Sequence, residues 1–304
     1  MFENVLVGYD GTARSDDALV LASLIASGSG GHITAVCVYW YLPTGGGAGA
    51  SYAGPDMRPG DLEEAVTRIA EHYDSAIEVK SVANPSSPRA LQELTEGHEF
   101  DLVIVGSTGR GKVGRTLPGT TADRLLHGSP CPVAVAPVGY RDRAPERLMR
   151  IGAAYCREPD AQPALEVAAE LAQETGAELA VVSAFDGAAI ERIRYGALGV
   201  GEVIVDAREA ASTDLADAVR VLGHSISIHA HLIDGSAVDV LTEQAADLDL
   251  LVLGSRGYGP VGRVLLGSVT HRLMLQSTAP LLVVPRTAGL ARHLREGGHS
   301  LATA

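Results

Sequence analysis

The sequence predicts an α/β fold made of two tandem doubly wound (Rossmann-like) domains. Each is expected to be a five-stranded parallel sheet of order 3-2-1-4-5 with helices on both faces. The length of 304 residues suits two domains at about 150 residues each. Apolar residues make up 46% of the chain and aromatic residues only 4%, so the core is aliphatic, as in buried parallel strands. Strand-like and helix-like patterns also alternate along the chain, as they do in parallel sheets.

An internal repeat shows that one domain fold occurs twice. Residues 101–137 align without a gap with residues 249–285, at an offset of 148 residues, and 17 of the 37 aligned positions are identical. This period is far too long for a solenoid, so the repeat indicates two copies of a domain. The predicted domains and the C-terminal tail are residues 1–142, 143–287 and 288–304.

The first domain begins with an apolar run, residues 4–10, that ends in turn residues and predicts a buried strand. Residues 15–28 carry apolar side chains at helical spacing and predict a helix. Ser15 is a candidate N-cap, and the negative charges of Asp16 and Asp17 suit the positive end of the helix dipole. Gly28 is expected to end the helix. The same patterns predict further strands at 32–40, 76–83, 101–106 and 132–137, and further helices at 62–73, 87–97 and 120–128.

The second domain repeats this order. Strands are expected at 148–154, 178–185, 225–233, 249–254 and 280–285, and helices at 163–176, 212–223, 237–248 and 268–276. The copies differ mainly after the second strand, where residues 42–60 are rich in Gly and Pro and predict a flexible loop, and residues 186–203 form a mixed stretch. Residues 139–147 are the expected linker.

Charge and cysteine content exclude several functions. The net charge of −13 makes nucleic acid and anionic membrane poor partners, so an anionic ligand would need a local electropositive pocket. The cysteines Cys37, Cys131 and Cys156 contain no CxxC pair, which fits a reducing compartment. Because we find no basic signal-like start and no long apolar run, we expect a cytoplasmic protein.

Residues 106–112 begin like a phosphate-binding P-loop, with Gly106, Gly111 and Lys112 correctly spaced. Val113, however, stands where a P-loop needs a Ser or Thr for magnesium, and the stretch follows the fourth strand instead of the first. The second copy has Pro260 in place of the lysine. The lysine therefore does not belong to the motif that the two copies share.

Both copies instead keep a spacing of glycines that ends in a hydroxyl residue. The positions are Gly106, Gly109, Gly119 and Thr120 in the first copy, and Gly254, Gly257, Gly267 and Ser268 in the second. We expect the first glycine to allow close approach of a ligand, the second to adopt a positive φ, and Thr120 or Ser268 to be the N-cap of a helix whose free N–H groups face an anion. Arg115 and Arg263 could add contacts to phosphate.

Topology adds Asp10 to this predicted site. In a doubly wound sheet the ligand lies at the carboxyl ends of the strands where their order reverses, here between the first and fourth strands. Asp10 follows the first strand and could accept hydrogen bonds from a base or ribose. Comparing the apolar runs suggests that Ala154 replaces this aspartate in the second copy.

With its "VGYDGT" opening, its "DLVIVGSTGRG" motif and its "CPVAVAP" ending, the chain resembles the universal stress protein family, as a tandem member of the ATP-binding subclass. The resemblance implies a cytoplasmic stress-response regulator that binds ATP, with Mg²⁺ as a possible counter-ion of the nucleotide and an unknown regulatory protein partner. It places the base near Asp10, Val38 and Val82. It places the phosphates near Gly106, Gly109, Arg110, Gly119, Thr120 and Thr121 in the first copy, and the matching positions of the second copy are Ile233, Gly254, Gly257, Gly267, Ser268 and Thr270.

Three functions stay open from the residues. A nucleotide-binding regulator with at most slow ATP hydrolysis fits best, because no paired carboxylates or catalytic triad can be recognised, and no catalytic residue or metal site is expected. An enzyme of the adenine-nucleotide α-hydrolase-like class would need paired glycines after the first strand, where residues 9–16 read "YDGTARSD". The third is a scaffold without a ligand. The apolar fifth strands are expected to pair with each other, within the chain as a pseudo-dimer or between chains as a homodimer.

Overall fold

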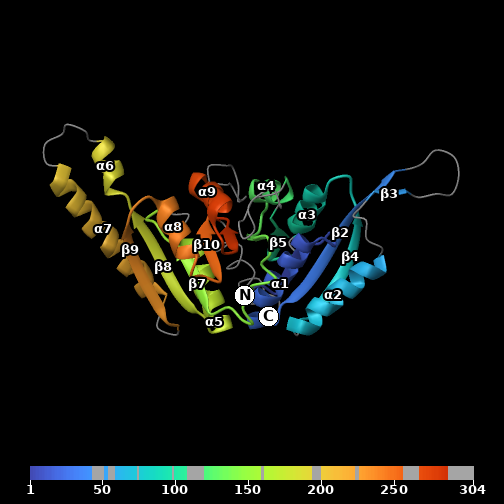
Figure 1. Ribbon diagram of the computed structural model, residues 1–304. Coiled ribbons are helices and arrows are strands. Elements are labelled where there is room, and N and C mark those ends of the chain that lie inside the picture. The colour runs from blue at the N-terminus through green and yellow to red at the C-terminus, as the bar shows by residue number, and fades with distance from the viewer. Residues whose placement is uncertain are drawn as a thin grey trace, which may run out of the picture.

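The computed structural model describes residues 1–42, 51–53, 59–73, 75–97, 99–107, 120–158, 161–193, 200–222, 226–255 and 267–286. These residues form one long twisted sheet with helices packed on both of its faces (Figure 1). The α/β class predicted from the sequence is therefore confirmed.

The first domain supplies five parallel strands in the predicted order. They are β1 (Asn4–Gly8), β2 (His32–Leu42), β4 (Ile77–Ala83), β5 (Leu102–Gly106) and β6 (Val133–Ala136). Their spatial order is β4-β2-β1-β5-β6, with every pair parallel. The order reverses between β1 and β5, so the carboxyl ends of these two strands form the switch point.

The second domain has the same arrangement. Its strands are β7 (Arg150–Ala154), β8 (Glu178–Phe185), β9 (Ile228–Asp234), β10 (Leu250–Gly254) and β11 (Leu281–Val284). Their order is β9-β8-β7-β10-β11, again with every pair parallel. Its switch point lies between β7 and β10.

The sheet has two features beyond the five parallel strands predicted for each domain. Strands β6 and β11 pair antiparallel, with Leu282 beside Ala134, so the domains share one sheet of eleven strands. This confirms that the fifth strands pair within the chain. A short extra strand, β3 (Ser51–Ala53), pairs antiparallel with the end of β2 inside the segment expected to be a loop.

Eight of the nine described helices divide evenly between the two faces, and α6 adds no residue to either buried cluster. The nine described helices are α1 (Ala13–Ser29), α2 (Pro59–Tyr73), α3 (Ser87–Glu96), α4 (Thr120–Leu126), α5 (Ala161–Thr175), α6 (Gly187–Ile193), α7 (Val200–Val221), α8 (Ala237–Ala245) and α9 (Ser268–Gln276). Residues of α1, α2, α5 and α7 join one buried apolar cluster, and residues of α3, α4, α8 and α9 join the other (Figure 1). Each cluster continues from one domain into the other, so the two domains share both cores.

Two sequence-based helix boundaries were wrong. α7 begins at Val200, whereas the apolar spacing predicted a start at residue 212. α1 runs past Gly28, which was expected to end it, and has its C-cap at Gly30 with φ 64°. Helices commonly end at a residue with left-handed backbone dihedral angles, and that residue is usually a glycine. Gly28 has another role, because a Cβ there would lie 2.9 Å from the main-chain carbon of Glu174 in α5.

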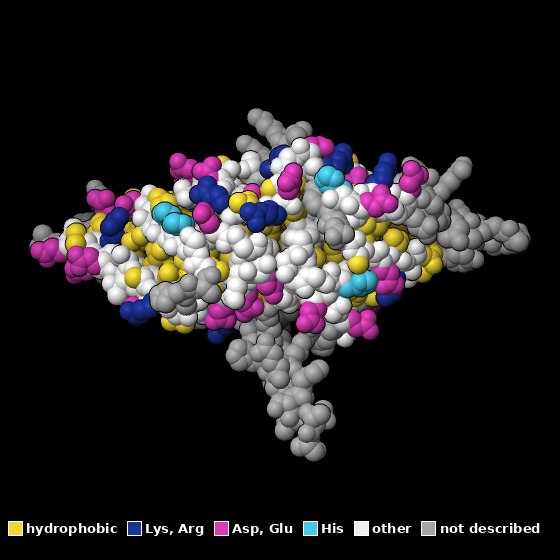
Figure 2. All heavy atoms as spheres, turned by 90° about the horizontal axis from the view of Figure 1, so that it is seen from below, with side chains coloured by type: hydrophobic (Ala, Val, Ile, Leu, Met, Phe, Trp, Pro, Cys, Tyr) yellow, Lys and Arg dark blue, Asp and Glu magenta, His cyan; other side chains and the backbone are white. Residues whose placement is uncertain are grey.

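The surface carries charge of both signs. Figure 2 shows acidic and basic side chains interspersed over the face seen from below, with no basic patch gathered among the described residues there. No helix within the described part of the chain has the length and apolar character that crossing a membrane requires.

Candidate nucleotide site

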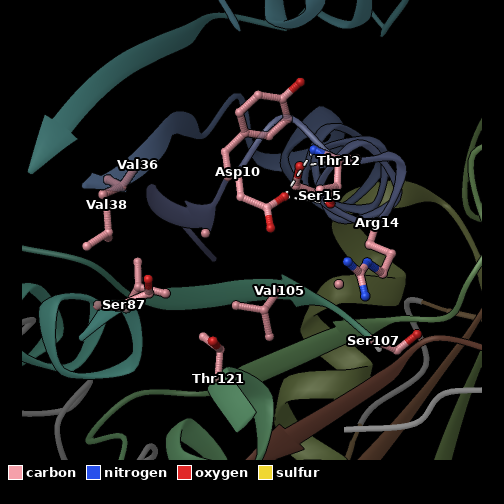
Figure 3. Close-up of a pocket in the computed structure, with 14 residues that line it drawn as sticks. Asp10, Thr12, Arg14, Ser15, Val36, Val38, Ser87, Val105, Ser107 and Thr121 are labelled. Carbon is pink, nitrogen blue, oxygen red and sulfur yellow. Dashed lines mark hydrogen bonds between the residues drawn. The ribbon is translucent and has the colours of Figure 1, made fainter. Parts of the chain in front are cut away.

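A cavity of about 210 Å³ opens at the switch point of the first domain, between the carboxyl ends of β1 and β5 (Figure 3). This is where the strand order predicts a ligand. The cavity is lined by Gly8, Tyr9, Asp10, Thr12, Arg14, Ser15, Val36, Val38, Ser87, Leu91, Val105, Gly106, Ser107 and Thr121. Four of the predicted site residues, Asp10, Val38, Gly106 and Thr121, belong to this lining.

The turn between β1 and α1 fixes the carboxylate of Asp10 at the mouth of the cavity. Gly11 has φ 73°, which glycine tolerates best. Oδ1 of Asp10 accepts hydrogen bonds from the main-chain N–H of Thr12 at 3.0 Å and from its hydroxyl at 2.5 Å. Oδ2 has no partner among the described residues. One carboxylate oxygen is therefore available to a hydroxyl or amine of a ligand.

The first turn of α1 forms the electropositive wall. Thr12 is the N-cap of α1, and Arg14 and Ser15 in the first turn line the cavity. The main-chain N–H groups of Ala13, Arg14 and Ser15 precede the first acceptor within the helix, and the dipole favours an anion here. Ser15, expected to be the N-cap, instead donates through its hydroxyl to the carbonyl of Thr12 at 2.8 Å. Arg14 was not predicted to belong to the site, although its place at the start of the helix that follows the first strand could have indicated it.

Gly106 has a role beyond the one predicted. A Cβ at this position would lie 2.1 Å from the main-chain oxygen of Arg14. Gly106 lines the cavity, as predicted, and the absence of a side chain there also lets α1 lie directly against β5. Its contribution to the site is to hold the first turn of α1 beside the cavity.

Ser107 is a buried hydroxyl without a partner. Its side chain lines the cavity, the residue is only 2% exposed, and its Oγ makes no hydrogen bond to any residue that the structure describes. Ser255, its counterpart in the repeat, is 0% exposed and likewise has no hydrogen-bond partner among the described residues. Such a group costs free energy unless something binds to it. Both copies of the repeat have a serine at this position, and this match could have indicated the two residues from the sequence.

The remaining wall is apolar. Val36 and Val38 of β2, Leu91 of α3 and Val105 of β5 line this side of the cavity. Val82, predicted with Val38 to lie near the base, is not among the lining residues but pairs with Val38 on the neighbouring strand β4. The cavity thus combines an apolar side with a polar, electropositive side.

Part of the predicted glycine loop lies outside the described residues, namely Gly109, Arg110, Arg115 and Gly119 in the first domain and Gly257 and Arg263 in the second. Thr120 is the first residue of α4, and Thr121 beside it lines the cavity. In the second domain the N-cap of α9 is Gly267, so the prediction that Ser268 caps this helix was wrong. Ser268 is the first helical residue.

The hydroxyl of Tyr9 connects the cavity to α1. It donates to Oδ1 of Asp16 at 2.8 Å. Burial, followed by the hydrogen bond and negative charge of Asp16, raises the pKa of Tyr9 well above its ordinary value. The phenol therefore stays protonated and keeps donating at neutral pH.

The second domain repeats the main-chain frame of the first. The N–H of Tyr9 donates to the carbonyl of Val36 at 2.9 Å, and the N–H of Tyr155 donates to the carbonyl of Val182 at 2.9 Å. Tyr9 and Tyr155 are therefore counterparts, at an offset of 146 residues.

This register corrects the comparison made from the sequence. Cys156, an exposed free cysteine, stands where the first domain has Asp10, and Ala154 corresponds to Gly8. The apolar runs were aligned two residues out of register, because the comparison matched Asp10 with Ala154 at an offset of 144 residues and the hydrogen bonds of the strands give 146. The second domain does lack the acidic side chain, as expected, but the residue in its place is a thiol.

The other described residues predicted for the second domain lie at strand ends or in the core. Gly254 ends β10, and Ile233 lies on β9 beside Ala184 of β8. Thr270 is buried and occupies on α9 the place that the core residue Ala122 has on α4, so it is not the counterpart of Thr121.

Within the described part of the chain, no three His, Cys, Asp or Glu side chains gather closely enough to hold a metal ion. Among the described residues that line the cavity, Asp10 is the one carboxylate and there is no histidine. The arrangement can bind an anionic ligand with an apolar portion, but it offers few groups for acid–base chemistry.

Comparisons with known proteins agree with this architecture. The model of the universal stress protein family matches residues 1–137 and again residues 148–285. A universal stress protein of Mycobacterium tuberculosis strain H37Rv is 29% identical over 296 residues, which cover 92% of this chain and 99% of that protein. One from Thermus aquaticus is 26% identical over 145 residues, covering 44% of this chain and 97% of its own length.

Solved structures show the same fold. The crystal structure of a universal stress protein from Archaeoglobus fulgidus superimposes with a TM-score of 0.63 at 20% identity, covering 93% of this chain and 98% of that one. A Pseudomonas aeruginosa protein of unknown function superimposes with a TM-score of 0.66 at 16% identity, covering 98% of each chain. With the family model matched twice, this chain belongs to the universal stress protein family as a tandem two-domain member.

Proposed function

We propose that the first domain binds ATP in the cavity at the β1/β5 switch point, and that the protein acts as a nucleotide-dependent regulator of the stress response. The observation that carries this proposal is the buried, unbonded hydroxyl of Ser107 in a cavity that Arg14 and the first turn of α1 also line. A phosphate oxygen there would accept hydrogen bonds from the serine, the guanidinium and the free N–H groups of the turn.

The opposite wall suits the nucleoside. Val36, Val38 and Leu91 offer an apolar surface for a base, and Oδ2 of Asp10 is free to accept from a hydroxyl or exocyclic amine. The chain's own residues thus bind and orient the ligand. Bound ATP and bound ADP would differ in charge and in their contacts with the protein. A nucleotide-dependent regulator can respond to that difference.

We further propose that hydrolysis is slow at most. Asp10 is held by Thr12 at the β1–α1 turn, and no second carboxylate or histidine lines the described cavity wall to activate water. A ligand-free scaffold is the second candidate, and the antiparallel pairing of β6 with β11 favours it, since that pairing joins the domains without any nucleotide.

The test is calorimetric titration of the purified chain with ATP, with GTP and ADP as competing probes and with and without Mg²⁺. Ligand released by denaturation and separated by anion exchange identifies what the protein carries. ATP in near-stoichiometric amount supports the binder. Rapid conversion to AMP would favour the α-hydrolase class, and the absence of both bound and titratable nucleotide would favour the scaffold.

Ser107→Ala is the decisive variant, with Ser255→Ala as its matched control in the second domain. Loss of a hydrogen bond to a charged phosphate costs about 1.5–3 kcal/mol, so the affinity of the first domain should fall at least about tenfold. The free energy of unfolding of the unliganded variant should stay the same or rise, because an unbonded buried hydroxyl has been removed. Unchanged affinity in Ser107→Ala would contradict the placement of the phosphates.

A further inference from the structure

The linker, residues 139–147, is held to the first domain by a buried carboxylate. Asp17 of α1 is 1% exposed. Its Oδ2 accepts from the main-chain N–H of Gly139 at 2.8 Å, and its Oδ1 accepts from that of Arg141 at 2.9 Å. The sequence predicted only a favourable charge near the helix start. In the second domain, at the offset of 146 residues, Pro163 occupies this place and offers no such acceptor.

Side chains of the linker extend this attachment to both domains. The guanidinium of Arg141 donates to the carbonyl of Ala13 at 2.8 Å and lies 3.4 Å from Oδ2 of Asp16. Arg143 lies over the ring of the buried Tyr140 and donates to the carbonyl of Thr278, in the connection between α9 and β11. The linker is therefore fixed to the first turns of α1 on one side and to the second domain on the other.

The same turns of α1 form the wall of the cavity. Thr12, Arg14 and Ser15 line the cavity, as Figure 3 shows, while Asp16 and Asp17 directly after them hold the linker. Tyr9 and Asp16 provide a second connection, because the tyrosine lines the cavity and its hydroxyl donates to the carboxylate that faces Arg141. Any shift or ordering of this helix start therefore acts on cavity and linker together.

We propose that nucleotide binding in the first domain is coupled to docking of the linker on α1, so that the occupied site holds the two domains together more firmly. This inference rests on the proposed function for the identity of the ligand. The physical reason is that an anion bound to the first turn fixes that turn in place, and the fixed turn presents Asp17 and Asp16 to the linker. Coupling of this kind is reciprocal, so a linker that cannot dock must weaken binding of the nucleotide by the same factor.

Hydrogen exchange of the peptide that contains Gly139 and Arg141, with and without saturating ATP, measures linker docking directly. We expect ATP to slow exchange of these two amides at least about fivefold, the lower end of typical allosteric coupling. In Asp17→Asn, exchange should be fast with or without ATP, and calorimetry should show affinity for ATP reduced at least about fivefold.

Asp142→Asn is the matched control. It removes the same charge from a largely exposed linker side chain that reaches only Nε of Arg141, at 3.5 Å. Its affinity for ATP should stay within about twofold of the parent chain. Should Asp17→Asn fail to fold, Arg141→Ala removes the contacts to Ala13 and Asp16 from a partly exposed position and should weaken ATP binding in the same direction.

The outcomes separate this coupling from the proposed function. If ATP binds with the expected heat but leaves exchange of the two linker amides unchanged, or binds equally well to Asp17→Asn, the coupling is overturned while the function stands. If ATP gives no heat and no protection anywhere in the first domain, the proposed function fails and the coupling fails with it.

Discussion

The main-chain oxygen of Arg14 lies so close to the α-carbon of Gly106 that a Cβ on the glycine would come within 2.1 Å of it. This contact sets the start of α1 against the end of β5, and with it two sides of the cavity at the switch point. Backbone cannot yield as the end of a flexible side chain can, so the position is specific for glycine.

Gly106→Ala should therefore destabilise the protein and displace the first turn of α1. Overpacking of this kind costs about 1–3 kcal/mol, measured as a fall in the free energy of unfolding in urea. Gly97→Ala is the control, since its Cβ would meet nothing closer than 3.6 Å. An equal, small effect of the two substitutions would mean that α1 moves away from β5 at no cost.

A second close approach joins the domains. A Cβ at Gly28 of α1 would lie 2.9 Å from the main-chain carbon of Glu174, where α1 packs on α5. We expect Gly28→Ala to lower the free energy of unfolding by about 1–3 kcal/mol. Gly201→Ala in α7 has open space around it and should be neutral or stabilising by up to about 1 kcal/mol. Equal behaviour of the two variants would show that the α1–α5 contact is not tightly packed.

Titration of Tyr9 makes the free energy of unfolding depend on pH in the alkaline range. Its pKa is raised above the ordinary value of 10.0 by burial and by Asp16. The phenol proton is therefore lost more easily from the unfolded chain than from the folded one. The stabilisation is fully present below about pH 10 and declines above it, by at most about 1.4 kcal/mol per pH unit.

Tyr9→Phe should flatten that decline relative to the parent chain. The measurement is a series of urea unfolding curves between about pH 9 and pH 11, in which the difference between the two proteins cancels the other titrating groups. At neutral pH the variant should be less stable by about 1 kcal/mol through loss of the hydrogen bond to Asp16. Parallel pH profiles would show that Tyr9 titrates normally in the folded protein.

Cys156 can be tested as the counterpart of Asp10. If an acidic side chain at this place helps to bind nucleotide, Cys156→Asp should raise the amount of ATP bound per chain or strengthen the weaker of two binding events in calorimetry. Cys156→Ser serves as the control, because it keeps a small polar side chain without the charge. A gain in the serine variant alone would point to the thiol as the obstacle.

The three cysteines should differ in reactivity. Cys37 and Cys131 are buried and Cys156 is exposed. Native protein treated with dithiodipyridine should release one equivalent of chromophore quickly and all three only after unfolding. Rapid reaction of a second thiol in the native protein would mean that a buried cysteine becomes exposed by local opening.

The amino-acid sequence by itself determined the class of fold, the tandem arrangement, the switch point of each domain and the pairing of the fifth strands. These follow from local patterns: apolar runs of strand length, apolar residues at helical spacing, and a motif repeated at a constant offset. Asp10 could be placed in the site because the carboxyl ends of neighbouring parallel strands meet at one edge of the sheet, whereas Val38 was placed there by the resemblance to the family.

Tertiary structure alone decided the rest. Gly106 was predicted to leave room for a ligand, and the structure adds that it lets α1 pack against β5. Asp17 was predicted only to interact favourably with the dipole of α1, and the structure shows that its carboxylate accepts hydrogen bonds from the linker. Cys156 could be matched to Asp10 only through the hydrogen bonds of β1 and β7 with their neighbours. In each case the deciding partner lies far away in the chain or in another strand, and a local pattern carries no information about which distant backbone will pack against it.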